Sequence, residues 1–212
     1  MKLSSTQSLA GILEPDFAIR TEDDLGIGDT EGVRQMVDWC QRHNLHIFQT
    51  LPINEVGDDN SPYNALSSLA IEPFTIALSP RLVPDLTEEQ FRKIATQNVL
   101  KAIRQGDVNY AKVKSLKRKL LEAAFATFVQ RHFNRENQRA TQFRAFLKEN
   151  ADWLSDYSLF RVLMEENGNR AAWDTWQQEH QEPRRARTWL LSLSEGRREE
   201  LWARVLGAFN LT

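Results

Sequence analysis

Residues 46–53 read His-Ile-Phe-Gln-Thr-Leu-Pro-Ile, a short and mostly apolar run that contains a proline near its end. Such a run is typical of a strand that is buried on both faces, as in a parallel sheet. The segment that follows at 60–73, Asn-Ser-Pro-Tyr-Asn-Ala-Leu-Ser-Ser-Leu-Ala-Ile-Glu-Pro, is polar and rich in turn-forming residues. Loops that leave the carboxyl ends of barrel strands are where barrel proteins build their sites. Together the two segments predict a parallel strand followed by a functional loop.

The residues before this strand predict a second strand and a helix. The apolar run at 10–13 can form a buried strand, and Asp29 or Thr30 can cap a helix that begins after Gly26-Ile27-Gly28. Apolar residues then recur at the spacing of one buried helical face, at Val33, Met36, Val37 and Cys40. Asn44 suits the left-handed position just beyond a helix. The order strand, helix, strand predicts one βαβ unit, which is parallel by default.

After Pro80 the apolar residues follow a helical period. A capping pattern at Thr87 and Gln90 predicts a helix start. Later apolar stripes predict a long helix over 113–129 and further helices at 143–147 and 153–164, the last of which is expected to stop at Asn167-Gly168. Pro183 is expected to break the chain before an apolar segment at 189–193 and a final helix around 201–205. We therefore predict a domain boundary at residues 80 and 81, with an α/β part over 1–80 and a helical insertion over 81–212.

Charge is distributed unevenly between these two parts. Residues 1–80 contain 4 Lys and Arg against 12 Asp and Glu, whereas residues 81–212 contain 23 against 17. The excess of basic residues in the second part is too dispersed to predict nucleic-acid binding. No apolar run approaches the ~18 residues of a membrane span, and the single cysteine, Cys40, excludes an intrachain disulfide. We expect a globular, cytoplasmic protein.

Several patterns have an ordinary structural interpretation. Gly26-x-Gly28 is not a dinucleotide fingerprint, because Glu31 occupies the position of the third glycine. Cys40, His43 and His46 would straddle a helix end and a strand, so a core role for Cys40 is favoured over a metal site. The basic run between Lys112 and Lys119 is interpreted as a solvated helix face. Trp173 and Trp176 are interpreted as core or interdomain residues in preference to a sugar platform, and Asp23-Asp24 and Asp58-Asp59 make no convincing catalytic dyad.

By itself, Ser61-Pro62-Tyr63 would be a turn in which Pro62 sets φ and Asn60 and Ser61 supply local hydrogen bonds. Read with Gly26-x-Gly28-Asp29, Phe-Gln-Thr-Leu-Pro at 48–52, Val-Asn-Tyr at 108–110 and the run at 149–160, it resembles the amylomaltase-type 4-α-glucanotransferases of glycoside hydrolase family 77. The Ser-Pro-Tyr block is the specific part of this resemblance. The sequence departs from many members at Asp58, where they have a sugar-contacting tyrosine, so that contact is not assigned here.

The resemblance implies a (β/α)8 barrel of the TIM type with helical insertions. It implies transfer of α-1,4-glucan segments between maltooligosaccharides through a covalent glycosyl-enzyme with retention, without a metal or an organic cofactor. Ser61, Tyr63 and Asn60 would shape the sugar site, with the tyrosine ring packed against the sugar at the cleavage point. The partners implied are α-1,4-glucans and, as a separate piece, the missing carboxyl-terminal part of the enzyme.

The resemblance also implies that the catalytic carboxylates are absent. In the family they lie on later strands, and none of those motifs occurs in this sequence, so no catalytic residue is assigned. A TIM barrel takes ~250 residues, and residues 1–80 supply only its first βαβ portion. We therefore expect a truncated, fragmentary or split enzyme that is inactive alone. The alternative is a non-catalytic helical interaction module or glucan-binding module derived from the family.

Overall fold

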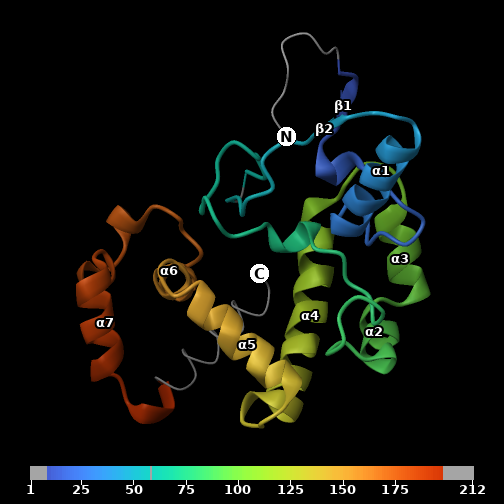
Figure 1. The fold of residues 1–212 in the computed structure, drawn as a ribbon. Helices are drawn as coiled ribbons and strands as arrows, with labels where there is room; N and C mark the ends of the chain where they lie inside the picture. The colour runs from blue at the N-terminus through green and yellow to red at the C-terminus, as the bar shows by residue number, and fades with distance from the viewer. Residues whose placement is uncertain (1–8, 58, 198–212) are drawn as a thin grey trace. The chain divides into compact units, whose positions relative to one another are not determined.

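The computed structural model describes residues 9–57 and 59–197 (Figure 1). Strand β1 (Gly11–Leu13) pairs in parallel with β2 (Ile47–Gln49), with Ile12 opposite Phe48. Helix α1 (Thr30–Arg42) connects them. The predicted βαβ order is therefore confirmed. The remaining helices are α2 (Glu88–Ile94), α3 (Gln97–Arg104), α4 (Tyr110–Phe128), α5 (Gln138–Glu149), α6 (Leu154–Glu166) and α7 (Pro183–Ser192), with short 3₁₀ or π turns between several of them.

The start of α1 is fixed by residues that the sequence singled out. The Asp29 carboxylate accepts hydrogen bonds from the backbone N–H groups of Glu31 and Gly32, at 3.1 and 3.2 Å. A Cβ at Gly28 would lie 2.0 Å from the Asp16 carbonyl oxygen, so only glycine fits this approach. Beyond the helix end Asn44 has φ 57°, the left-handed conformation expected of it.

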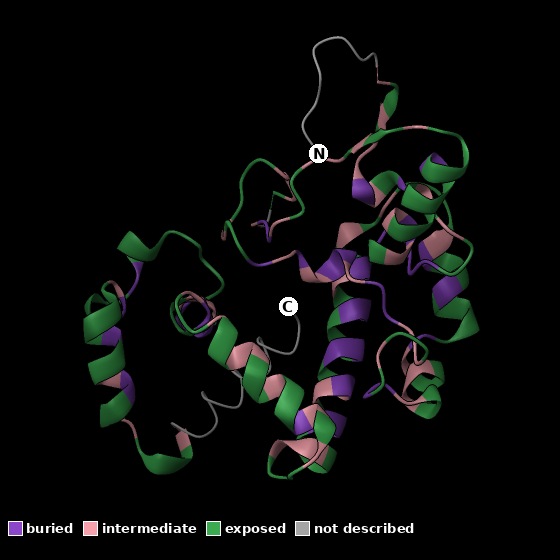
Figure 2. Ribbon diagram, viewed as in Figure 1, coloured by how far each residue is buried: buried purple, intermediate pink, exposed green. Residues whose placement is uncertain are grey.

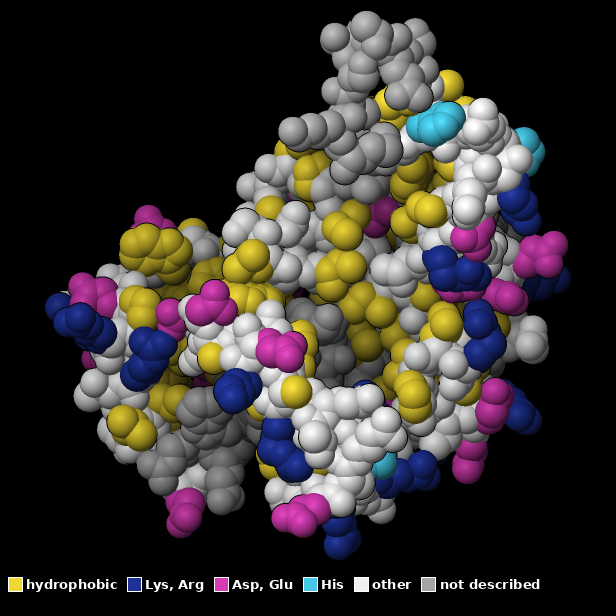
Figure 3. Space-filling model, in the orientation of Figure 1, with side chains coloured by type: hydrophobic (Ala, Val, Ile, Leu, Met, Phe, Trp, Pro, Cys, Tyr) yellow, Lys and Arg dark blue, Asp and Glu magenta, His cyan; other side chains and the backbone are white. Residues whose placement is uncertain are grey.

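The prediction that β2 is buried on both faces is wrong. Ile47 is 41% exposed and Leu13 is 55% exposed. The physical reason is that the sheet has two strands in the described residues, so each strand has an unpaired edge and no cover on at least one face. Figure 3 shows hydrophobic side chains at the surface of the molecule. The face of α1 is likewise only partly covered, since Val37 is 47% exposed whereas Cys40 is buried.

The helices after residue 80 begin and end largely where the pattern predicts. Thr87 and Gln90 form the reciprocal capping box at the start of α2. Buried positions recur along α4, as Figure 2 shows. Helix α6 ends at Glu166, and Gly168 then takes φ 73°. Pro183 is the first residue of α7 and does not interrupt it, because the first helical position needs no backbone N–H.

The chain divides into two compact units, one that ends at Ala123 and one that begins at Ala124. This division by packing falls inside α4, whereas the predicted boundary at 80 and 81 marks a change in secondary structure and stays a prediction. The core of the second unit comes from Leu154, Val162 and Leu190, with aromatic residues of α5 to α7 around them. The helix predicted around 201–205 lies outside the described residues. Within those residues, no helix is long and apolar enough to cross a membrane.

Candidate functional site

The segment after β2 folds back on itself as an arm that is held by isolated antiparallel bridges. Asn54 and Val56 pair antiparallel with Ile71 and Ala65. The backbone N–H groups of Leu66 and Glu72 donate to the carbonyl oxygens of Glu55 and Ile53, at 2.7 and 2.9 Å. The arm therefore has a departing segment at 53–56 and a returning segment at 65–72. Gly57 and residues 59–64, which include Ser61-Pro62-Tyr63, form its tip.

The tip is held by a carboxylate that sequence reasoning had not identified. Asp59 accepts hydrogen bonds from the Ser61 backbone N–H at 3.2 Å and from the Asn64 side-chain amide at 2.8 Å. The hydrogen bond from Asn64, with that from Ser61, keeps the pKa of the Asp59 carboxyl below its usual value. The Asn64 N–H also closes a turn onto the Ser61 carbonyl oxygen at 3.0 Å. Asn60 precedes this turn with φ 55°.

The three predicted site residues lie on this tip but face different surroundings. Asn60 lines a pocket, together with Pro62. Tyr63 is 76% exposed, and neither it nor Ser61 is among the residues that line that pocket. The other lining residues come from four places in the chain. Asp16 and Phe17 follow β1, Pro52, Ile53, Asn54 and Val56 follow β2, Glu72, Phe74 and Thr75 lie at or just after the end of the returning segment, and Tyr110 begins α4. The pocket thus combines apolar and aromatic walls with a few polar groups.

Among the residues that line the pocket, Glu72 has the most strongly shifted pKa. Its side chain is buried, and its carboxyl oxygens accept hydrogen bonds from the backbone N–H groups of Val56 at 2.8 Å and Phe74 at 3.4 Å. Burial raises the pKa of Glu72 to about 7, and the nearby charge of Glu55 adds to the shift. In the sequence, Glu72 belongs to the segment predicted as a turn-rich loop. The signal that could have found it is an acidic residue inside the otherwise apolar run 69–74.

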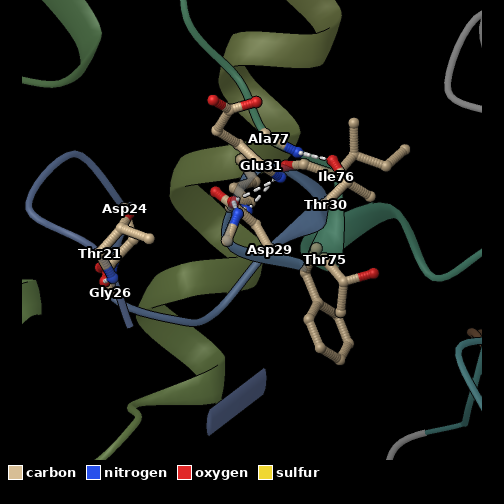
Figure 4. Close-up of polar contacts among 12 residues, drawn as sticks. Thr21, Asp24, Gly26, Asp29, Thr30, Glu31, Thr75, Ile76 and Ala77 are labelled. Carbon is tan, nitrogen blue, oxygen red and sulfur yellow. Dashed lines mark hydrogen bonds and ion pairs between the residues drawn. The ribbon is translucent and has the colours of Figure 1, made fainter. Parts of the chain in front are cut away.

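Residues 76 and 77, just after the returning segment, are hydrogen-bonded to α1 and α4. The Ala77 backbone N–H donates to the Thr30 hydroxyl at 3.0 Å (Figure 4). The Lys117 ammonium donates to the Ile76 carbonyl oxygen at 2.8 Å and lies 3.9 Å from the Asp29 carboxylate. These contacts join the start of α1, residues 76 and 77 and the middle of α4.

Lys117 corrects one prediction made from the sequence. The basic run was expected to form a solvated face, and Lys112, Arg118 and Lys119 are indeed exposed, whereas Lys117 is 1% exposed. The helical period explains this, because Lys117 lies four residues after Val113 and three before Leu120, on the buried side of α4. Burial lowers the pKa of Lys117 to about 8 and raises the pKa of Asp29.

Other candidates from the sequence have structural roles. Asp24 is buried and pairs with Arg20, with 2.8 Å between Oδ2 and Nε. Cys40 is buried, and the His43 ring stacks on Trp39 with 4.2 Å between centroids. Trp176 is buried and its indole N–H donates to the Arg170 carbonyl oxygen at 2.7 Å. Across the described residues, three or more His, Cys, Asp or Glu side chains do not gather into a group that could hold a metal ion.

A family model described as 4-alpha-glucanotransferase, glycoside hydrolase family 77, matches residues 15–204. Among curated proteins, the 4-alpha-glucanotransferase of Chlamydia pneumoniae is 31% identical over 162 residues, which are 76% of this chain and 30% of that protein. The 4-alpha-glucanotransferase of Synechocystis sp. is 32% identical over 167 residues, 77% of this chain and 31% of that protein. The chain therefore spans about a third of the length of these relatives.

The solved structures give a consistent result for the fold. An amylomaltase from Streptococcus agalactiae, in complex with acarbose, matches with a TM-score of 0.68 at 20% identity. The match covers 97% of this chain and 39% of that one. The chain thus shares the fold of part of that larger structure.

Proposed function

The chain belongs to the 4-alpha-glucanotransferase family, glycoside hydrolase family 77, and from this membership we propose that it supplies a sugar-contacting part of such an enzyme. The reaction is the transfer of an α-1,4-glucan segment from one maltooligosaccharide to another. The observation that supports this assignment most is the family match over 15–204, which includes the Ser61-Pro62-Tyr63 turn beyond β2 with its exposed tyrosine.

In this proposal the arm places Tyr63 where a pyranose ring can stack on it. A flat aromatic ring covers the apolar face of a sugar, and the phenol hydroxyl can hydrogen-bond to a sugar hydroxyl. The hydrogen bonds of Asp59 hold the turn in one conformation before sugar binds, which reduces the ordering cost of binding. The Ser61 hydroxyl and the Asn60 amide are the polar contacts proposed beside the ring.

We further infer that β1, α1 and β2 are the opening βαβ portion of a (β/α)8 barrel. The likeness to the streptococcal amylomaltase over 39% of its length supports this arrangement. Exposed apolar side chains on the strands, such as Leu13 and Ile47, are the surfaces that further strands and helices would cover. The retaining reaction needs two carboxyl groups ~5–5.5 Å apart, and we propose that both come from outside these 212 residues. The chain alone is then inactive.

The proposal predicts a direct contact between maltooligosaccharide and Tyr63. The chain has three tyrosines, Tyr63, Tyr110 and Tyr157, so selective labelling with ¹⁵N-tyrosine gives three amide resonances that Tyr→Phe variants assign. Adding maltoheptaose should move the Tyr63 resonance and leave that of Tyr157 in place, because the proposed sugar site includes no residue of the compact unit to which Tyr157 belongs. Maltoheptaose that moves neither resonance, or moves both equally, would contradict the proposed site.

A further inference from the structure

The Glu72 side chain crosses the arm beyond β2. Glu72 lies on the returning segment, and its carboxyl group reaches back to accept the Val56 N–H of the departing segment at 2.8 Å. The same carboxyl group accepts the Phe74 N–H, at 3.4 Å, where the η2 turn (Pro73–Thr75) begins. The backbone of Glu72 also donates to the Ile53 carbonyl oxygen at 2.9 Å. Beside the backbone hydrogen bonds of the arm, Glu72 therefore links its two segments through a side chain and connects them to the turn that follows.

We propose that Glu72 is a positioning residue of the Ser-Pro-Tyr loop: its carboxyl group holds the departing segment to the returning one and so sets where the tip presents Tyr63. The claim rests on the proposed function only for what the loop does, which is to contact sugar. The fastening itself is a property of this chain and can be measured without sugar.

The surroundings of Glu72 make this fastening sensitive to pH. Glu55, on the departing segment, is buried beside it, Lys114 approaches from α4, and Asp16 lines the same pocket. The only basic group among these, Lys114, lies over the Phe74 ring, with its Nζ 4.9 Å from the ring centroid. Burial and the charge of Glu55 therefore outweigh the groups that favour ionisation, and the pKa of Glu72 rises to about 7.

The direction of the pH effect follows from this shift. In the unfolded chain the pKa of Glu72 is 4.5, so between pH 4.5 and about 7 the native arm binds a proton that the unfolded chain has released. The contribution of Glu72 to the stability of the closed arm is therefore full below pH 4.5 and is lost as the pH rises through about 7. Above that pH the ionised carboxylate is costly to keep buried, so its free energy falls if it moves toward water. Such a movement would loosen the base of the loop.

The experiment uses the full 212-residue chain with ¹⁵N-labelled tyrosine, titrated from pH 5 to pH 9 without sugar. The Tyr63 amide resonance is expected to move with a midpoint near the pKa of Glu72, about 7. In Glu72→Gln the step should disappear, and the resonance should stay near its low-pH position. Glutamine is neutral and of similar size, and its carbonyl oxygen can still accept the Val56 N–H. The low pKa of Asp59 keeps that carboxylate ionised throughout this range.

Two further variants identify the group responsible. Glu89→Gln, at an exposed carboxyl group on α2, should leave the step unchanged. Glu55→Gln should also keep it. The proposal is overturned if the Tyr63 resonance does not move with pH in the unmodified chain, or if it moves with the same midpoint in Glu72→Gln. It is also overturned if Glu55→Gln abolishes the step while Glu72→Gln keeps it. The two proposals can fail separately. If the pH step depends on Glu72 but maltoheptaose does not move the Tyr63 resonance, the positioning role is supported and the proposed function is rejected.

Discussion

Replacing Lys117 by alanine is expected to lower the free energy of unfolding by about 3–5 kcal/mol, the usual cost of removing one partner from a buried ion pair. Lys117 is 1% exposed, donates to the Ile76 carbonyl oxygen and faces the Asp29 carboxylate. The substitution would leave Asp29 buried without this cation, leave a carbonyl oxygen without this donor, and open a cavity beside Leu120. Because domains are stable by only ~5–15 kcal/mol, a loss of this size is large.

Urea denaturation followed by circular dichroism measures this loss, and Lys119→Ala supplies the matched control. Lys119 lies two residues further along α4 and is exposed, so its replacement should change the free energy of unfolding by less than ~0.5 kcal/mol. If Lys117→Ala is no more destabilising than Lys119→Ala, the buried position of Lys117 is wrong and the solvated-face interpretation of the basic run is right.

Tyr63→Ala is expected to reduce kcat/KM by roughly tenfold to a hundredfold in a completed enzyme, in which residues 1–212 precede the remainder of a relative such as the Synechocystis 4-alpha-glucanotransferase. The estimate combines an aromatic contact of ~1 kcal/mol beyond area burial with a lost hydrogen bond of similar size. Tyr63→Phe keeps the ring and should lose less.

The exposure of Tyr63 separates this effect from a loss of folding. With 76% of its surface exposed, Tyr63 contributes little to the core, so Tyr63→Ala should unfold at the same urea concentration as the unmodified enzyme. If the variant instead melts while the specific activity of its folded fraction is unchanged, Ser61-Pro62-Tyr63 is a structural turn and the site assignment fails.

The features that the sequence predicted correctly depend on neighbours along the chain. The Asp29 cap, the left-handed Asn44 and the capping box of Thr87 with Gln90 each involve residues within one helical turn, so local chemistry determines them. The resemblance identified the family, which the family match over 15–204 confirms. The positions of Asn60, Ser61 and Tyr63 on one turn follow from their adjacency, but their roles toward sugar stay a prediction.

The features that the sequence did not predict depend on contacts between distant segments. Ile47 was expected to be buried because its run is apolar, but burial depends on what lies over a strand, and the described chain offers one neighbouring strand. Lys117 was assigned by its charge, although its helical position placed it among buried residues. Glu72 acquires its hydrogen bond from Val56, sixteen residues earlier in the sequence, and no local pattern indicates that contact.

The measurement that tests the central claim most directly is glucose release from maltotriose by two purified proteins, the 212-residue chain and the hybrid enzyme that adds the remainder of the Synechocystis relative. The account predicts no release by the chain alone and disproportionation by the hybrid, because this chain would contribute the sugar-contacting loop and the remainder would contribute the catalytic carboxylates. The contradicting result is turnover by the chain alone that survives repurification and is abolished by Asp16→Asn or Glu72→Gln, since that would place the catalytic carboxyl groups in the pocket of this chain.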